Sequence, residues 1–163
     1  MNPLFYTWYE SPFGRLLLVG SHHGLNYLSF SSGKHAISVS PRWSEDRAVL
    51  RNAIAQLEEY FRGRRRTFDL ALFPEGTPFQ KQVWTALETI PYGETISYRD
   101  LAQRIGRPKT IRAVGAANGA NPIPIIIPCH RVIGHNGSLT GFGGGLPMKR
   151  RLLELESRQL ALL

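Results

Sequence analysis

Cys129 is the only cysteine of this chain, and a histidine follows it at once in the segment NPIPIIIPCHRVIG, residues 121–134. A cysteine is nucleophilic as its thiolate, and an ordinary thiol with a pKa near ~8.5 is mostly protonated at neutral pH. A base such as His130 can remove that proton, and an acid that orients the base completes a Cys-His-acid arrangement. The pair therefore indicates a nucleophilic cysteine.

The alternative is that Cys129 is a small inert hydrophobe in a buried strand, because isoleucines precede it. Three features oppose this interpretation. Pro128 lacks a backbone donor and suits a central strand poorly. Pro122 and Pro124 stiffen the approach, and a glycine-rich stretch follows instead of more core. We expect the prolines to shape a turn that exposes the sulfur. In an extended chain adjacent side chains point to opposite faces, so direct contact between His130 and the sulfur is not guaranteed, and one water could bridge them.

The acid that would orient His130 has two candidates in the last predicted helix, Glu154 and Glu156. They are two residues apart, which is about 200° around a helix, so only one of them can face inward. Leu152 and Leu155 are expected to pack inward, but this pattern does not choose between the two glutamates.

Length and composition limit the kinds of protein that this chain can be. The chain has 163 residues, 42% of them apolar, which suits one compact domain or two small ones with a real core. No apolar stretch approaches the ~18 residues of a membrane span, and the first residues do not resemble a secretory signal. One cysteine excludes an internal disulfide and a cysteine-based zinc cluster within the chain. A reducing, cytoplasmic setting is the simplest interpretation.

The net charge of +8 is distributed unevenly. Residues 1–77 hold 9 Lys/Arg and 7 Asp/Glu, whereas residues 78–163 hold 11 and 5. The basic excess therefore lies mostly in the half that contains Cys129. A polyanion such as nucleic acid is a natural partner for such a half. Plain solubility explains the charge equally well.

The first half is expected to be a small α/β unit. Residues 4–30 contain three runs rich in aromatic and branched side chains, separated by the turn sequences SPFG and HHG, and predict a β-meander. A helical stripe with a C-terminal stop at Gly63 follows. The stripe consists of Leu50, Ile54, Leu57 and Phe61. Residues 64–73, RRRTFDLALF, are then predicted to return as a strand.

The second half is expected to be mostly helical, which makes the chain α+β. Thr77 with Pro78 and Gln80 gives a capping-box pattern, and Ser97 with Asp100 repeats it for a short helix. A tight turn and a third helix, residues 109–118, complete a helix-turn-helix pattern. That third helix is rich in Ala and Gly, which allows close approach to DNA or to a neighbouring helix. A final helix starts near residue 147.

IPCHRVIG, preceded by RAVGAANGANPIPII and followed by LTGFGGG, closely resembles the O6-alkylguanine-DNA alkyltransferases, also called methylated-DNA–protein-cysteine methyltransferases. The chain looks like a stand-alone bacterial member. The resemblance is strong over residues 77–158. It implies a ribonuclease-H-like structural domain, residues 1–76, and a winged-helix-like DNA-binding and alkyl-acceptor domain, residues 77–163.

The resemblance also implies a mechanism. A member of this family binds double-stranded DNA containing O6-alkylguanine through its helix-turn-helix, in the minor groove, and flips the damaged base out of the stack. Cys129 then takes the alkyl group in a single displacement and keeps it as a thioether, so each molecule acts once. O4-alkylthymine is a second expected substrate. No cofactor, metal or membrane takes part, and the free protein is expected to be a monomer.

The roles of individual residues follow from the same resemblance. Cys129 is the alkyl acceptor, His130 the water-mediated base and Glu156 the acid that orients it. Tyr98 assists flipping and donates to the leaving guanine, and Asn121 ties the recognition helix to the active-site segment.

Arg112 matches the arginine that enters the duplex and takes the place of the flipped base. The other expected DNA-facing positions are Thr110, Ala113 and Ala117. The expected substrate pocket has Pro124 as a wall, the backbone of Val132 as an acceptor, and Phe142, Gly143 and Gly144 at its rim, with a backbone donor to O6 at Gly143. Lys149 also falls on a family position, without a firm role.

Three positions depart from common family patterns. Phe142 stands where many relatives have tyrosine, Gly143 where some have serine, and Gly119 where some have arginine. These departures predict a roomier, less polar pocket and tolerance of bulky adducts.

Two other functions compete with alkyl transfer. Non-enzymatic damage-binding relatives replace the acceptor cysteine, often with tryptophan, and the intact Cys129 argues against that. A regulator that merely binds DNA would not explain a lone cysteine beside His130 and a glycine-rich loop.

Overall fold

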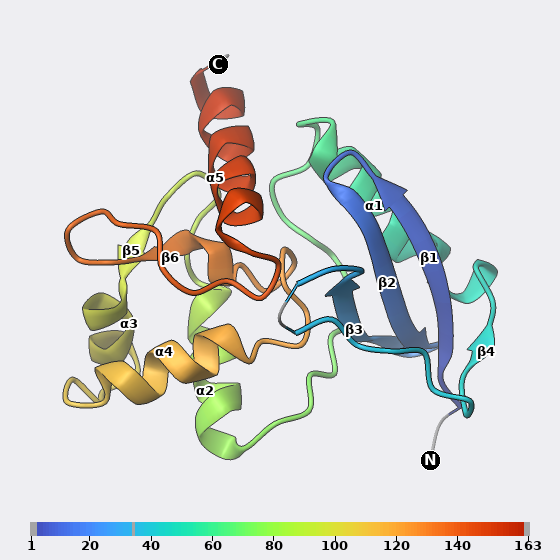
Figure 1. The fold of residues 1–163 in the computed structure, drawn as a ribbon, viewed down its shortest axis with the longest axis horizontal. Coiled ribbons are helices and arrows are strands. Elements are labelled where there is room, and N and C mark those ends of the chain that lie inside the picture. Colours follow the sequence, from blue (N-terminus) through green and yellow to red (C-terminus); the bar gives the residue numbers. More distant parts are fainter. Residues whose placement is uncertain (1–2, 34, 162–163) are drawn as a thin grey trace.

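The computed structural model describes residues 3–33 and 35–161, and Figure 1 shows a sheet part followed by a helical part. Among these residues the sheet has the strand order β3-β2-β1-β4. Strands β1 (Phe5–Ser11), β2 (Gly14–Ser21) and β3 (Gly24–Phe30) form an antiparallel meander. The short β4 (Ser44–Glu45) pairs in parallel with β1. The predicted meander is thus confirmed.

The predicted helix after the meander is also present. A 3₁₀ turn, η1 (Ala48–Leu50), leads into α1 (Arg51–Phe61), and Gly63 takes a left-handed backbone with φ 73° just after the helix. The apolar stripe of α1 is buried and packs beside the sheet, where Phe61 contacts Tyr9 of β1. Burial of this stripe joins α1 and the sheet in one core.

The prediction of a strand over residues 64–73 is wrong. Within the described residues this segment makes one isolated bridge, between Leu72 and Leu25. A side chain replaces a partner strand: Gln56 donates to the Asp69 carbonyl at 2.9 Å and accepts from the Asp69 amide at 2.8 Å. Because these bonds satisfy the backbone of Asp69, the segment does not need a continuous ladder.

The helical part contains α2 (Pro78–Leu87), α3 (Tyr98–Arg104), α4 (Ile111–Gly119) and α5 (Leu146–Ala161). Both predicted capping boxes are present, at Thr77 with Gln80 and at Ser97 with Asp100. Such caps satisfy amide groups that the first turn of a helix leaves without partners. The sequence therefore defines where α2 and α3 begin.

Helices α3 and α4 form the helix-turn-helix pair, and Figure 1 shows α4 running from the outer side of the helical part toward the middle of the molecule. Gly106 has a φ of 72° in the connecting turn, a backbone conformation that favours glycine. The indole of Trp84 in α2 donates a 2.8 Å hydrogen bond to the carbonyl of Ala117. This bond anchors α4 to the core from its inner side.

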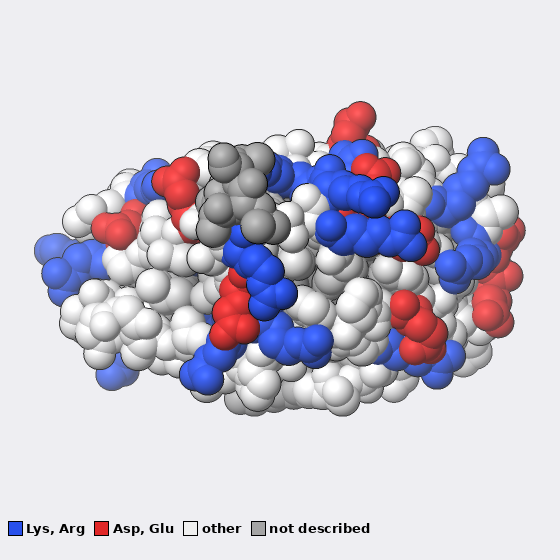
Figure 2. Space-filling model, turned by 90° about the horizontal axis from the view of Figure 1, so that it is seen from above, with Lys and Arg blue, Asp and Glu red and all other residues white. Residues whose placement is uncertain are grey.

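A small sheet domain followed by a helical domain confirms the α+β fold class. None of the helices in the described ranges combines the length and apolarity that crossing a membrane would need. Figure 2 shows Lys and Arg side chains spread along one whole face of the molecule, interspersed with Asp and Glu. The positive charge thus extends over both halves of the chain on this face.

Candidate active site

Two short parallel strands place the Cys129 segment beside the helix-turn-helix. Strand β5 (Ile96–Ser97) pairs with β6 (Val132–Ile133), with Ile96 opposite Val132. The chain passes from β5 directly into α3, whose first residue is Tyr98. A 3₁₀ turn, η2 (Cys129–Arg131), ends directly at β6. The pairing therefore fixes the Cys129 turn, which precedes β6, relative to α3, which follows β5.

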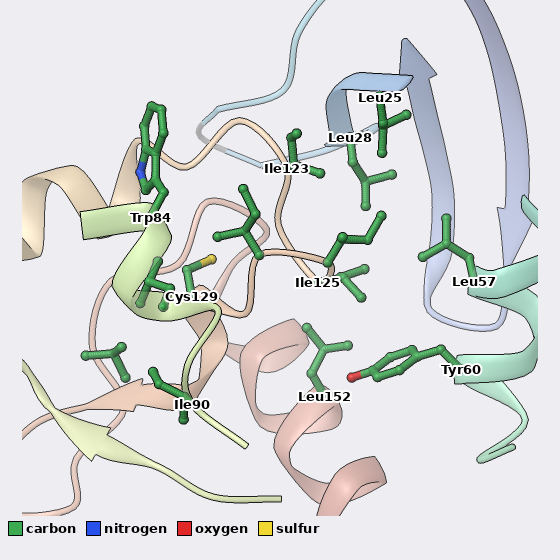
Figure 3. Packing of buried hydrophobic residues seen from close by; sticks show 14 of the residues in the cluster. Leu25, Leu28, Leu57, Tyr60, Trp84, Ile90, Ile123, Ile125, Cys129 and Leu152 are labelled. Carbon is green, nitrogen blue, oxygen red and sulfur yellow. The ribbon is translucent and has the colours of Figure 1, made fainter. Parts of the chain in front are cut away.

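The expectation of an extended chain at Cys129 is wrong, because Cys129–Arg131 form a 3₁₀ turn. The approach to it is strained: Ile125 has a φ of 74°, an unusual conformation for a β-branched residue. This backbone conformation costs a residue other than glycine roughly 1–3 kcal/mol, and it persists only where the surrounding structure holds the residue in place. Ile125 is buried, and its side chain points into the core in Figure 3.

Two asparagines tie the end of α4 to this segment. Asn121 donates to the carbonyl of Ile127 at 2.7 Å and accepts from the amide of Ile123 at 2.9 Å. Asn118, inside α4, donates to the carbonyl of Cys129 at 3.3 Å. The geometry at Asn121 agrees with the connecting role expected for it, and Asn118 is an additional link that the sequence analysis missed.

Cys129 is 4% exposed, so the turn does not bring its sulfur to the open surface as expected. Instead the residue lines a cavity of about 370 Å³ between the two parts of the chain. Pro124, Gly143 and Gly144 line the same cavity, as does Gly119. The first half of the chain contributes further lining residues, among them Tyr27, Ser29, Phe30 and His35.

A buried carboxylate collects the polar groups behind the cavity. Oε2 of Glu156 lies 2.7 Å from His130 Nε2 and accepts from Arg131 Nη2 at 3.0 Å and from the Tyr60 hydroxyl at 2.7 Å. Oε1 accepts from Arg131 Nε at 2.9 Å and from the amide of Gly93 at 3.1 Å. The carboxylate is thus held from several elements at once.

These contacts separate the two glutamates that the helical pattern left open. Glu156 is completely buried, whereas Glu154 is exposed. Burial alone would raise the pKa of Glu156, but hydrogen bonds from His130 and Arg131, together with the positive charge of Arg131, outweigh it and hold that pKa well below its ordinary value. Glu156 is therefore ionised at neutral pH.

An ionised Glu156 assigns the proton on His130. The nitrogen facing the carboxylate, Nε2, must donate, which leaves the lone pair on Nδ1. That Nδ1 atom is buried and has no hydrogen-bond partner among the described residues. Burial also lowers the pKa of His130, and the hydrogen bond and charge of Glu156 offset this only in part. The imidazole is therefore a neutral base with an available Nδ1.

The thiol of Cys129 is protonated in this arrangement. Burial raises its pKa to about 11, and the Asn121 amide and the positive charge of Lys149 counter only part of that effect. Lys149 is itself buried and donates to the carbonyls of Val132 at 2.5 Å and Thr140 at 2.8 Å. Its pKa is lowered by burial to about 8. A proton acceptor is therefore needed before Cys129 can act as a nucleophile.

Tyr98 is not among the residues that line the cavity, and its hydroxyl donates to the carbonyl of Thr140 at 2.9 Å. Phe142 does not line the cavity as expected, because its ring packs edge-on against Phe30 with the ring centroids 5.7 Å apart. Val132 is fully buried and also absent from the lining. Its carbonyl accepts from Lys149, which leaves one lone pair for a further donor.

The expected DNA-facing residues divide between the surface and the core. Arg112 and Ala113 are exposed on α4, and Thr110 is half-buried before its first turn. Ala117 is only 3% exposed and belongs to the hydrophobic core, so its assignment to a DNA-facing surface is wrong. The reason is the helical period: Ala117 lies one turn below Val114 on the buried side of α4.

Arg131 and Tyr60 are the main site residues that the sequence analysis missed. Arg131 is a charged residue in an otherwise apolar stretch, which is a usable signal for a buried ion pair. Tyr60 gives no such signal. It falls on the apolar stripe of α1, and its partner Glu156 is 96 residues away in the sequence.

Two family models together match most of the chain. The ribonuclease-like domain of 6-O-methylguanine DNA methyltransferase matches residues 4–74. The DNA binding domain of the same family matches residues 78–158 and includes the Cys129 turn.

Curated relatives match over nearly their whole length. The methylated-DNA–protein-cysteine methyltransferase of Methanosarcina acetivorans is 54% identical over 94% of this chain and 98% of that protein. The Mycobacterium tuberculosis protein of the same name is 49% identical over 94% of this chain and 92% of its own.

Solved structures agree with these relatives. The crystal structure of Mycobacterium tuberculosis O6-methylguanine methyltransferase superposes with a TM-score of 0.88 at 47% identity, covering 98% of each chain. Mycobacterium tuberculosis OGT in complex with DNA gives 0.89 at 48% identity, covering 95% of this chain and 94% of that one. This chain therefore belongs to the 6-O-methylguanine DNA methyltransferase family.

Proposed function

We propose that this protein repairs DNA by transferring the alkyl group of O6-alkylguanine to Cys129. The observation that carries the proposal is a group of three buried side chains. Cys129 places a thiol on the cavity, His130 is a neutral imidazole with an available Nδ1, and Glu156 is a carboxylate that fixes the imidazole. Relatives at 54% and 49% identity are named for methyl transfer from DNA to a protein cysteine, and one similar structure is a complex with DNA.

The transfer is a single displacement at carbon. Nδ1 of His130 takes the thiol proton of Cys129 through one water, and the thiolate attacks the alkyl carbon from the side opposite O6. The new S–C bond forms as the C–O bond breaks, and the electron pair of that bond stays on the guanine. A hydrogen-bond donor at the departing oxygen stabilises this charge, and the hydroxyl of Tyr98 is proposed to be that donor.

The approach to DNA uses the helix-turn-helix of α3 and α4 in the minor groove. The damaged base must leave the stack, which costs a few kcal/mol. Arg112, exposed on α4, takes the place of the flipped base, and Thr110 and Ala113 lie beside it on the surface. The groove carries little sequence information, which suits a repair protein that meets damage in any context.

The pocket for the flipped base is the cavity at Cys129. Pro124, Gly143 and Gly144 form part of its wall, and the carbonyl of Val132 is proposed to accept from the guanine amine. A thioether does not hydrolyse, so one protein molecule removes one alkyl group, with neither cofactor nor metal. We assign residues 1–76 a structural role and residues 77–163 the DNA-binding and acceptor role, in a monomer that works in the cytoplasm. O4-alkylthymine is a secondary substrate.

A stoichiometry measurement tests the function. A duplex oligonucleotide with one O6-methylguanine is titrated with protein, and restored guanine is counted by chromatography after digestion. The proposal predicts a plateau at one guanine restored per active protein molecule. Tight binding of the damaged duplex without any restored guanine would identify a damage-binding protein instead, and repeated turnover would rule out a permanent thioether.

A further inference from the structure

Tyr60 belongs to α1, in the sheet part of the chain, yet its hydroxyl ends at the acceptor site. The residue is fully buried, and its hydroxyl donates a 2.7 Å hydrogen bond to Oε2 of Glu156. Figure 3 shows the hydroxyl pointing from α1 toward α5, beside Leu152. This bond joins the two parts of the chain at the carboxylate that holds His130.

The same oxygen of Glu156 faces both Tyr60 and His130, each at 2.7 Å. A hydrogen bond to a carboxylate stabilises its charged form and lowers its affinity for a proton. Donation from Tyr60 therefore weakens the pull of Oε2 on the Nε2 proton of His130. Without that donation the oxygen would stabilise a doubly protonated imidazolium more strongly, and His130 would lose its free Nδ1 at a higher pH.

We propose that Tyr60 is a positioning residue for alkyl transfer, which fixes Oε2 of Glu156 and keeps His130 neutral. The proposal rests on the function proposed above, because Tyr60 acts through His130 in that same reaction. It also gives the sheet domain a part in the chemistry beyond a structural shell.

The other charged or titratable groups around the pair are few among the described residues and stay constant in a suitable pH range. Arg131 carries a guanidinium, a group that proteins do not deprotonate. The pKa of Lys149 is about 8 and that of Cys129 about 11, so neither changes state below pH 7. Tyr60 remains a donor, because burial and the charge of Glu156 raise its pKa well above the ordinary value. The acid limb of the rate therefore reports on His130.

Tyr60→Phe removes one oxygen and keeps the ring. We measure the transfer rate on an O6-methylguanine duplex as a function of pH. The pH at which the rate falls to half on the acid side should rise by roughly 0.5 to 1 pH unit. The ratio of wild-type to variant rate should therefore grow as the pH falls. 3-Fluorotyrosine at position 60 is a stronger hydrogen-bond donor and should lower that half-rate pH instead.

Tyr92→Phe is the matched control. Tyr92 is a buried tyrosine whose ring lies 6.2 Å from that of Tyr60, and its hydroxyl has no hydrogen-bond partner among the described residues. The same atom is thus removed from the same cluster without touching Glu156. Thermal unfolding of both variants measures any general loss of stability.

Two outcomes overturn the role of Tyr60: equal pH profiles in Tyr60→Phe and Tyr92→Phe, or a slowing by one constant factor at every pH. An NMR titration of the His130 ring decides the matter without any activity. His130 should begin to protonate at higher pH in Tyr60→Phe than in the wild type and in Tyr92→Phe, and unchanged titration contradicts the proposal. A wild-type protein that transfers nothing would instead refute the proposed function.

Discussion

His130 and Glu156 lie 2.7 Å apart, and this one contact decides which side of the imidazole can receive a proton. Nε2 donates to the carboxylate, so the lone pair lies on the buried Nδ1, which has no hydrogen-bond partner among the described residues. The neighbouring thiol is neutral, with a pKa raised to about 11 by burial. Cys129 is thus held in a protonated, weakly nucleophilic state, next in the chain to a neutral imidazole.

A protonated thiol should be slow to react with small electrophiles. We expect iodoacetamide to modify Cys129 slowly at pH 7 to 8 and to accelerate as the pH approaches about 11, where the thiolate forms. Labelling kinetics in the folded protein check this, with the urea-unfolded protein as the control. Labelling of the folded protein at pH 7 as fast as that of the unfolded chain would show an accessible thiol with an ordinary pKa and would contradict this prediction.

Removal of the charge on Glu156 should cost both stability and activity. Glu156→Gln leaves Arg131 without its buried partner, a change that typically costs about 3–5 kcal/mol in the free energy of unfolding. Glu154→Gln is the control on the same helix, where an exposed side chain should change stability by less than about 0.5 kcal/mol. Urea unfolding at pH 7 measures both, and equal effects of the two substitutions would contradict the assignment of Glu156.

The contribution of Glu156 to stability should depend on pH. Its pKa is lowered in the folded protein from an ordinary value of 4.5, so its stabilisation is fully present above that value. It is lost as the pH falls further, toward the folded-state pKa. The difference in free energy of unfolding between wild type and Glu156→Gln should therefore narrow below pH 4.5. A difference that stays constant down to pH 3 would be inconsistent with an ionised carboxylate.

Arg112 should matter most where a base must leave an intact stack. Arg112→Ala is expected to slow transfer from a duplex by roughly tenfold or more, since each 1.4 kcal/mol of lost stabilisation gives a factor of ten. Transfer from a single-stranded oligonucleotide should change much less. Arg51→Ala, an exposed arginine on α1, serves as a control for net charge. Equal slowing on both substrates would argue against a role in base flipping.

The cavity should accept an adduct larger than methyl. A side chain added at Gly119 would meet open space, so this position leaves room beside Cys129. We expect O6-benzylguanine and O6-methylguanine in matched oligonucleotides to compete with rates within about tenfold of each other, a difference of 1.4 kcal/mol. Gly119→Arg should slow the benzyl substrate more than the methyl one. Strong rejection of the benzyl group by the wild type would contradict this prediction.

Much of the fold could be predicted because it follows local rules. Capping boxes at Thr77 and Ser97 define helix starts, and the apolar stripe of α1 defines a buried face. The failures came from contacts between distant residues. The side chain of Gln56 takes the place of a strand partner for Asp69, which no local pattern indicates.

The candidate site shows the same division. The types of Cys129 and His130 indicated their chemistry, but the choice of Glu156 over Glu154 came from the family resemblance and agrees with the burial seen in the structure. Ala117 was assigned to the DNA-facing surface from the family resemblance alone, and its side chain in fact faces the core. Tyr60 could not be found from the sequence, since a hydroxyl on an apolar stripe does not reveal its partner.

The most direct test of the central claim is the mass of the intact protein after incubation with an O6-methylguanine duplex. Our account predicts that one methyl group replaces one hydrogen, and that peptide mapping places the methyl group on Cys129. Cys129→Ser should bind the same duplex and keep its mass. An unchanged mass of the wild-type protein at saturating DNA, or a methyl group on any other residue, would contradict the account.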